Sequence, residues 1–135
     1  MKRVIQKDAS GCGIACVAMV AGVPYDRVMK VAASLSLFKG RKGFYTFPSE
    51  LVALLAAFGI KSRFRWHPWR WSTLTSLSIA GIHYRESDRS WHWVVYVPDP
   101  QGGYVLDSRK RIHTERRRDF DRMTPFRYRV EVQVL

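Results

Sequence analysis

The segment QKDASGCGIACVAMVAG, residues 6–22, places a cysteine between two glycines directly before an apolar run. The run IACVAMVA, residues 14–21, is apolar on every side, so a helix formed here is expected to be buried all round. Gly11 marks the start of this helix and Gly22 marks its end. Cys12 is therefore predicted to lie at the N-terminus of a buried helix.

This position favours a reactive thiol at Cys12. The N–H groups of the first helical turn have no intrahelical partners, and the helix dipole favours an anion there. Both effects favour the thiolate, which is the nucleophilic form. Glycine on each side of Cys12 would also let a substrate backbone approach closely. Cys16 lies inside the apolar run and is expected to be part of the core. A zinc site built from both cysteines is disfavoured, because their spacing fits no common zinc pattern.

A cysteine nucleophile needs a base, and the chain has four histidines: His67, His83, His92 and His113. His92 is preferred because it lies in one arm of a predicted hairpin, with strands at residues 91–97 and 103–107. A turn centred at residues 99–100 places His92 opposite Asp107 and brings the imidazole near the carboxylate. A one-residue change of register would send the two side chains to different faces. The other three histidines are expected at the surface or in loops.

The carboxylate of Asp107 would orient the ring of His92 and stabilise its imidazolium. Gln6, six residues before Cys12, carries an amide that can donate a hydrogen bond to an oxyanion, together with the backbone N–H of Cys12. The predicted nucleophile, base, orienting group and oxyanion donor are therefore Cys12, His92, Asp107 and Gln6. This chemistry is acyl transfer, and it requires neither a cofactor nor a metal.

The rest of the chain changes from helical to alternating patterns. Helical spacing is found over residues 25–37 and 51–58, the second with Ser49 as its cap. Alternation follows over residues 60–66, 79–84 and 127–135. Helices followed by an antiparallel sheet predict an α+β fold, in a single domain covering residues 1–135.

Three of these motifs resemble those of a known family. The segments QKDASGCGIACVAMVAG, HWVVYV and YVLDS resemble, in that order, the cysteine, histidine and aspartate motifs of the bacteriocin-processing double-glycine peptidases. That family is a branch of the papain-like cysteine peptidases, and the likeness covers most of residues 4–107. The resemblance implies a papain-like fold, with N-terminal helices packed on an antiparallel sheet. It also implies a hydrolase that cleaves a peptide bond, in this family after glycine in a leader peptide, through a thioester acyl-enzyme.

The chain departs from the family at two positions. Gly11 stands where the family usually has aspartate, and Ser108 follows Asp107 where the family often has proline. Family members often sit on membrane transporters, whereas this chain is expected to be a stand-alone domain. Two alternatives to the peptidase stay open. One is a deamidase or amide-transferring toxin that uses the same site, because papain-like folds host both activities. The other is a non-catalytic module that binds nucleic acid or peptide.

The net charge of +12 favours an anionic partner in addition to a peptide or protein substrate. The block RKRIHTERRR, residues 109–118, is expected to be mostly a solvated basic face that borders the cleft beside Asp107. Aromatic and arginine residues alternate over residues 63–71. They could form a stacking platform for single-stranded nucleic acid, but packing into the core or a substrate groove is preferred.

The composition also limits the cellular location. Two cysteines are too few for a disulfide framework, so reduced thiols in a reducing compartment are expected. No stretch reaches the roughly 18 apolar residues that a membrane span requires. Polar residues at positions 6–13 interrupt the N-terminal region where a signal peptide should become apolar. A cytoplasmic protein is therefore expected, and the family resemblance implies a bacterial one.

Overall fold

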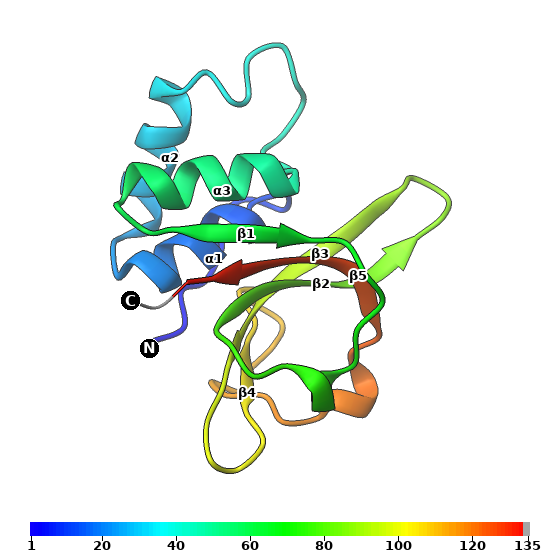
Figure 1. Cartoon of the computed structure of the whole chain (residues 1–135). Coiled ribbons are helices and arrows are strands. Elements are labelled where there is room, and N and C mark those ends of the chain that lie inside the picture. The colour runs from blue at the N-terminus through cyan, green and yellow to red at the C-terminus, as the bar shows by residue number, and fades with distance from the viewer. Residues whose placement is uncertain (134–135) are drawn as a thin grey trace.

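Residues 1–133 are described by a computed structural model, which contains three α-helices and one five-stranded antiparallel sheet (Figure 1). The helices are α1 (Cys12–Ala21), α2 (Tyr25–Ser34) and α3 (Pro48–Ala57). The strands are β1 (Ser62–Arg65), β2 (Ser78–Arg85), β3 (Ser90–Val97), β4 (Tyr104–Leu106) and β5 (Pro125–Val132), and their order across the sheet is β1-β5-β2-β3-β4. Short 3₁₀ helices lie at Trp71–Thr73 and Phe120–Arg122. The predicted α+β class, with helices preceding an antiparallel sheet, is confirmed.

The middle of the sheet is buried on both faces. The three helices gather on one face, as Figure 1 shows, and there Trp93 and Val95 of β3 join the main core. The alternate residues Val94 and Tyr96 join a second, smaller core on the opposite face, with Trp71. This alternation follows from the period of two along a strand. Residues 93–96 of β3 are therefore packed from both sides.

Helix α1 is the central helix, as its apolar composition predicts. Eight of its ten residues are buried, and it packs directly against β3. The helix ends at Gly22, whose φ of 68° is left-handed, a conformation that glycine adopts readily. Within residues 1–133 no single helix is long and apolar enough to cross a membrane, although α1 and α2, which meet at 109°, pass that test as a pair.

The other two helices differ from prediction at their ends. Helix α2 ends at Ser34 instead of residue 37, because the chain turns at Ser36, whose φ of 57° is left-handed. The prediction that Ser49 caps α3 is wrong. The N-cap is Phe47, and its N–H donates to the side chain of Glu50 at 2.8 Å. Proline at position 48 is the first helical residue, where its missing N–H costs nothing.

Several strands are shorter than predicted or are displaced. Strand β1 covers only Ser62–Arg65, and β4 covers only Tyr104–Leu106. Strand β5 begins at Pro125 and ends at Val132, so it starts two residues earlier than the predicted segment 127–135. Residues 134–135 of that segment lie outside the described residues.

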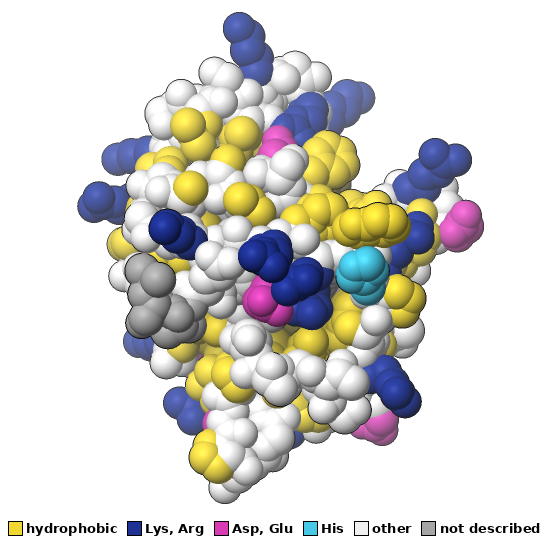
Figure 2. Space-filling view, in the orientation of Figure 1, with side chains coloured by type: hydrophobic (Ala, Val, Ile, Leu, Met, Phe, Trp, Pro, Cys, Tyr) yellow, Lys and Arg dark blue, Asp and Glu magenta, His cyan; other side chains and the backbone are white. Residues whose placement is uncertain are grey.

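The aromatic residues near β1 act mainly in packing. The indole N–H groups of Trp69 and Trp71 donate to the backbone carbonyls of Phe126 and Met123 at 2.6 and 2.8 Å. Trp66, in contrast, is 58% exposed. Lys and Arg side chains occur in several separate places on the face that Figure 2 shows, with Asp and Glu side chains beside some of them. On this face the net positive charge does not form one continuous basic surface.

Candidate active site

Cys12 is the first residue of α1, as predicted, and it lies against the strand that carries His92. Cys12 is 5% exposed. Its sulfur accepts a hydrogen bond from the backbone N–H of Trp93 at 3.5 Å. The N–H of Cys12 itself belongs to the first helical turn, and it has no hydrogen-bond partner among residues 1–133. This N–H is therefore available to an oxygen that approaches the thiol.

The glycines on either side of Cys12 are required by the packing of the protein itself. A Cβ atom at Gly11 would collide with the hydroxyl of Tyr25, and one at Gly13 would collide with Oγ1 of Thr46. The Tyr25 hydroxyl is held in place by a hydrogen bond to the carboxylate of Asp8 at 2.8 Å. The expectation that these glycines admit a substrate backbone is therefore corrected, because protein side chains fill the space.

The predicted contact between His92 and Asp107 is present, although the predicted register is wrong. His92 Nε2 lies 2.9 Å from Asp107 Oδ1. Strands β3 and β4 pair Val95 with Leu106 and Val97 with Tyr104, which is two residues away from the register that places His92 opposite Asp107. A shift of two keeps both side chains on the same face, and diagonal neighbours remain within reach of long side chains.

Two opposing influences set the pKa of the His92 imidazole. Burial of the ring is the largest influence and lowers its pKa, but hydrogen bonds with Asp107 and with the Cys12 side chain act in the opposite direction and prevail. The pKa of His92 is therefore raised above its usual value. Because Nε2 is engaged by Asp107, the ring nitrogen that remains for Cys12 is Nδ1.

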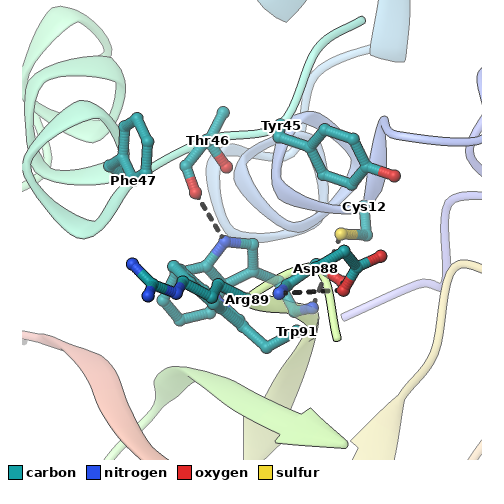
Figure 3. Close-up of a pocket in the computed structure, with 9 residues that line it drawn as sticks. Cys12, Tyr45, Thr46, Phe47, Asp88, Arg89 and Trp91 are labelled. Carbon is teal, nitrogen blue, oxygen red and sulfur yellow. Dashed lines mark hydrogen bonds between the residues drawn. The ribbon is translucent and has the colours of Figure 1, made fainter. Parts of the chain in front are cut away.

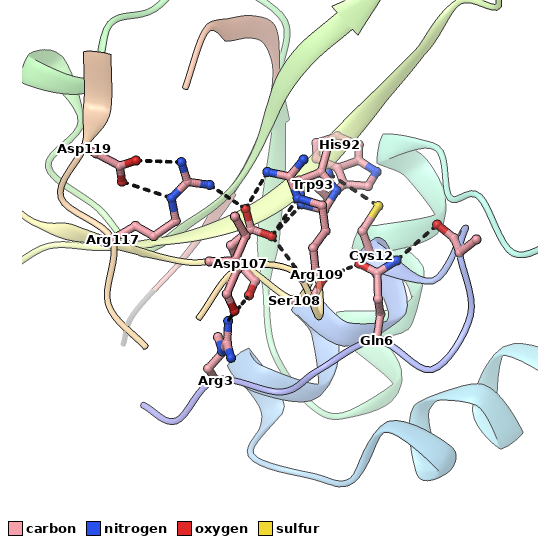
Figure 4. Close-up of polar contacts among 12 residues, drawn as sticks. Arg3, Gln6, Cys12, His92, Trp93, Asp107, Ser108, Arg109, Arg117 and Asp119 are labelled. Atoms are coloured by element: carbon pink, nitrogen blue, oxygen red, sulfur yellow. Dashed lines mark hydrogen bonds and ion pairs between the residues drawn. The ribbon is translucent and has the colours of Figure 1, made fainter. Parts of the chain in front are cut away.

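Asp107 is completely buried, and two arginines hold it in addition to His92 (Figure 4). Arg109 Nη2 and Arg117 Nη1 each lie 2.8 Å from Asp107 Oδ2, and the backbone N–H of Arg109 donates to Oδ1 at 3.1 Å. Burial opposes ionisation, but the bonds from His92 and Arg109 outweigh it, so the pKa of Asp107 is lowered far below its usual value. Asp107 is thus a permanent carboxylate.

Residues 109–118 are mostly exposed and border the cavity, as predicted, but Arg117 is an exception. The side chain of Arg117 is only 8% exposed, and a second carboxylate, Asp119, holds it at 2.8 Å. Within this mostly solvated block, Arg109 and Arg117 form the wall behind Asp107. Arg109, two residues after Asp107, is close to it in the sequence, whereas Arg117, ten residues after Asp107, has no such signal.

Gln6 is buried, and its side-chain amide is engaged by neighbouring groups of the protein. Its Nε2 donates to the carbonyls of Asp8 and Ala9 at 2.9 and 3.1 Å, and its Oε1 accepts from Ser108 Oγ at 2.6 Å. Both amide hydrogens are thus used within the loop that precedes Cys12. Ser108, the departure from the family pattern, ties this loop to the strand end that carries Asp107.

Two cavities open on the thiol, and Cys12, Tyr45, Ser90 and Trp91 line both of them. The first is largely apolar, with a volume of about 260 Å³, and Figure 3 shows Cys12 and Tyr45 at one end of it and Phe47 at the other. The second has a volume of about 480 Å³ and contains His92 and several arginines. His83, expected at the surface or in a loop, is half-buried in β2 and lines the second cavity.

Cys16 lies one turn further along α1 and differs sharply from Cys12. It is completely buried. Burial raises the pKa of the Cys16 thiol well above its usual value, and the neighbouring Cys12 and Asp107 raise it further. Within residues 1–133, no group of three or more His, Cys, Asp or Glu side chains is arranged to hold a metal ion.

We expect an iodoacetamide-type probe to label Cys12 in the folded protein much faster than Cys16. Cys12 borders two cavities and has a histidine partner, whereas Cys16 is buried and kept as a thiol. Peptide mapping by mass spectrometry at short reaction times measures the two rates separately. Unfolding the protein in denaturant is the control, because it should make the two rates similar. Faster labelling of Cys16 in the native state would contradict the assignment of Cys12.

Comparison with known proteins supports this fold. No protein-family model matches the sequence, and no curated protein matches it. Two similar solved structures are both peptidase domains. The peptidase domain of Streptococcus ComA, a bi-functional ABC transporter involved in a quorum-sensing pathway, superposes with a TM-score of 0.70 at 16% identity, covering 99% of this chain and 98% of that one. A double-glycine-motif protease from an AMS/PCAT transporter, in complex with the leader peptide, superposes with a TM-score of 0.64 at 17% identity, covering 98% and 91%. The chain therefore has the papain-like fold of double-glycine peptidase domains, as the motifs imply.

Proposed function

We propose that this protein is a cysteine peptidase that hydrolyses a peptide bond through a thioester acyl-enzyme. One observation carries the proposal. The thiol of Cys12 lies at the N-terminus of α1, near enough to His92 to raise the pKa of its imidazole, and His92 Nε2 is held by the buried carboxylate of Asp107. Cys12, His92 and Asp107 thus supply a nucleophile, a base and an orienting group, which is the set of groups that acyl transfer requires.

The two half-reactions use the same groups. His92 takes the thiol proton, and the thiolate of Cys12 attacks the carbonyl carbon of the scissile bond. The oxyanion that forms accepts a hydrogen bond from the free backbone N–H of Cys12. His92 then protonates the leaving amine, and a thioester remains on Cys12. In the second half, His92 deprotonates a water molecule, which attacks the thioester and releases the acid and the free thiol.

The apolar cavity supports a peptide substrate. Its aromatic lining, which includes Tyr45, Phe47 and Trp91, can pack against the side chains of an extended or helical peptide next to the thiol. One similar structure holds a leader peptide, and we extend that substrate class to this chain, with cleavage after glycine. Cys12 and Cys16 are both free thiols, which supports a reducing compartment such as the cytoplasm.

Product analysis tests the proposal directly. The protein is incubated with peptides that contain both a Gly-Gly sequence and glutamine side chains, and the products are analysed by mass spectrometry. Two fragments whose masses sum to the peptide plus water support the peptidase. Conversion of a side-chain amide to a carboxylate in an intact peptide would instead identify a deamidase with the same site. An unchanged peptide would count against both enzymes and favour a binding module.

We propose Gln6 as the second oxyanion donor. Its amide would give up the longer of its two hydrogen bonds, to the Ala9 carbonyl, and donate that hydrogen to the oxyanion. Gln6→Ala is then expected to lower kcat by about 10²–10³-fold, with KM nearly unchanged, because the charge exists only in the transition state. Gln6→Glu should be at least as damaging, since it replaces a donor with a negative charge. Steady-state kinetics with a cleavable peptide measures both constants.

The control for Gln6 is Ser108→Ala. This variant removes the hydrogen bond to Gln6 Oε1 but leaves the amide donors in place. If Gln6 only fixes the loop before Cys12, both variants should lower thermal stability and activity together. A folded Gln6→Ala variant with normal kcat rules out the oxyanion role.

A further inference from the structure

The second cavity at the thiol is unusually basic. Its volume is about 480 Å³, and its lining includes no Asp or Glu side chain among the described residues but five arginines: Arg85, Arg109, Arg111, Arg117 and Arg122. These residues come from β2, from the segment after Asp107 and from the second 3₁₀ helix, so they converge from separate parts of the sequence. A cleft lined by one sign of charge concentrates the opposite charge in a ligand.

Ion pairs account for only some of these arginines. Arg109 and Arg117 are paired with Asp107, and Arg117 is also paired with Asp119. Arg85 is paired with Asp88 at 2.7 Å, on the outer end of the β2–β3 hairpin. Arg111 and Arg122, by contrast, have no ion-pair partner within residues 1–133, and both are exposed. These two guanidinium groups can pair with an incoming anion without first breaking a contact.

His83 gives an independent indication of the same positive environment. It lies at an irregularity in the pairing of β2, and its φ of 56° is left-handed, which is rare for a non-glycine residue and costs conformational energy. Burial lowers the pKa of His83, and the charges of Arg109, His92 and Arg117 lower it further, with only Asp107 opposing. The fold thus holds this imidazole at a cationic wall despite the backbone strain.

The two cavities share the thiol but differ in chemistry. Apart from the residues common to both, the first is lined by Thr46, Phe47, Trp93 and the hairpin tip, and the second by the basic residues. A peptide that crosses Cys12 therefore places one side of its scissile bond over an apolar surface and the other side over a basic one.

From this geometry we infer that the basic cavity is a specificity subsite for an acidic side chain of the substrate, on one side of the scissile bond. The ligand chemistry is a carboxylate, which a guanidinium binds through two parallel hydrogen bonds. Arg111 and Arg122 supply the recognition, while Arg109 and Arg117 form a charged wall already neutralised in part by Asp107. This inference rests on the proposed peptidase activity, and it names the class of substrate that the site prefers.

The test uses peptides that keep Gly-Gly directly before the bond and differ only by Glu or Gln, placed at the third position before the bond or at one of the three positions after it. We expect at least about tenfold higher kcat/KM for Glu, at positions on one side only, and a smaller preference at high salt. The variant Arg111→Gln/Arg122→Gln should lose this preference. Arg27→Gln/Arg63→Gln removes the same charge from exposed residues on α2 and β1 that do not line the cavity, and it should keep the preference.

Further variants and a binding measurement separate the two proposals. The charge-reversal variant Arg111→Glu should cleave a peptide with Lys at the preferred position faster than the peptide with Glu there. A nonspecific loss of stability cannot produce this reversal. Binding of the peptides to the Cys12→Ala variant, measured by fluorescence anisotropy, does not depend on cleavage. Cleavage with equal rates for Glu and Gln overturns the subsite and leaves the peptidase standing. If Glu peptides bind more tightly than Gln peptides but no protein with Cys12 intact cleaves them, the subsite is supported and the peptidase is overturned.

Discussion

Cys12→Ala is expected to abolish peptide hydrolysis, with kcat reduced by about 10⁶-fold, and to leave the fold intact. The expected size follows from nucleophile removal in other triad enzymes, where the remaining groups cannot substitute for it. The side chain of Cys12 lies at the surface of the main core beside two cavities, so its loss leaves little unfilled space inside the protein. A sensitive fluorogenic peptide assay measures the activity, and a circular dichroism melt checks the fold.

The matched control is Cys16→Ala, on the same helix one turn away. It makes the same chemical change, the loss of a thiol, but leaves the groups that act on His92 in place. We expect Cys16→Ala to retain turnover and to lose some thermal stability, because it leaves a cavity in a fully buried position. Full activity in a folded Cys12→Ala variant would exclude covalent catalysis at this residue.

The second large effect is expected from Asp107→Asn, which should impair both stability and catalysis. Two guanidinium groups and an imidazole depend on this buried carboxylate. Removing one partner of a buried ion pair costs about 3–5 kcal/mol of unfolding free energy. The charge of Asp107 also raises the pKa of His92, so its removal should shift the alkaline limb of the kcat/KM profile to lower pH. Denaturant unfolding and a pH–rate profile measure the two effects.

Asp119→Asn is the control for Asp107→Asn. Both substitutions remove a carboxylate from Arg117, but only Asp107 contacts His92. The side chain of Asp119 is 40% exposed, so its loss should cost about 1 kcal/mol or less. The alkaline limb of the pH profile should then stay in place. If both variants move the limb equally, Asp107 acts through general electrostatics and not by orienting His92.

The pairing of His92 with Asp107 shows which part of a site can be predicted from sequence and which cannot. The alternation of apolar residues predicts which face of a strand a residue occupies, since that depends only on odd or even position. The exact opposite residue depends on how many residues the turn uses. Here the turn contains two more residues than predicted. A register shift of two residues keeps His92 and Asp107 on the same face, so their contact is still formed.

Gln6 and the arginines show the opposite situation. Nothing in the sequence around Gln6 indicates that both of its amide hydrogens would be taken by the carbonyls of Asp8 and Ala9. The isolated β-bridge that pairs Val105 with Arg117 returns the chain from the basic block to the strand before Asp107. No repeating pattern in the sequence links Arg117 to Val105. Only the folded chain therefore places Arg117 against the carboxylate of Asp107.

The sequence by itself determined the buried helix, the position of Cys12 at its N-terminus and the order of helices before sheet. These features depend on local properties, namely apolar composition, glycine positions and the period of the pattern. Only the tertiary structure decided the register of β3 against β4, the clamp of Arg109 and Arg117 on Asp107, and the basic cavity beside the thiol. Each of these depends on where long connections bring distant residues together. Local preferences do not specify that placement, because it is set by the packing of the sheet against α1 and the loops.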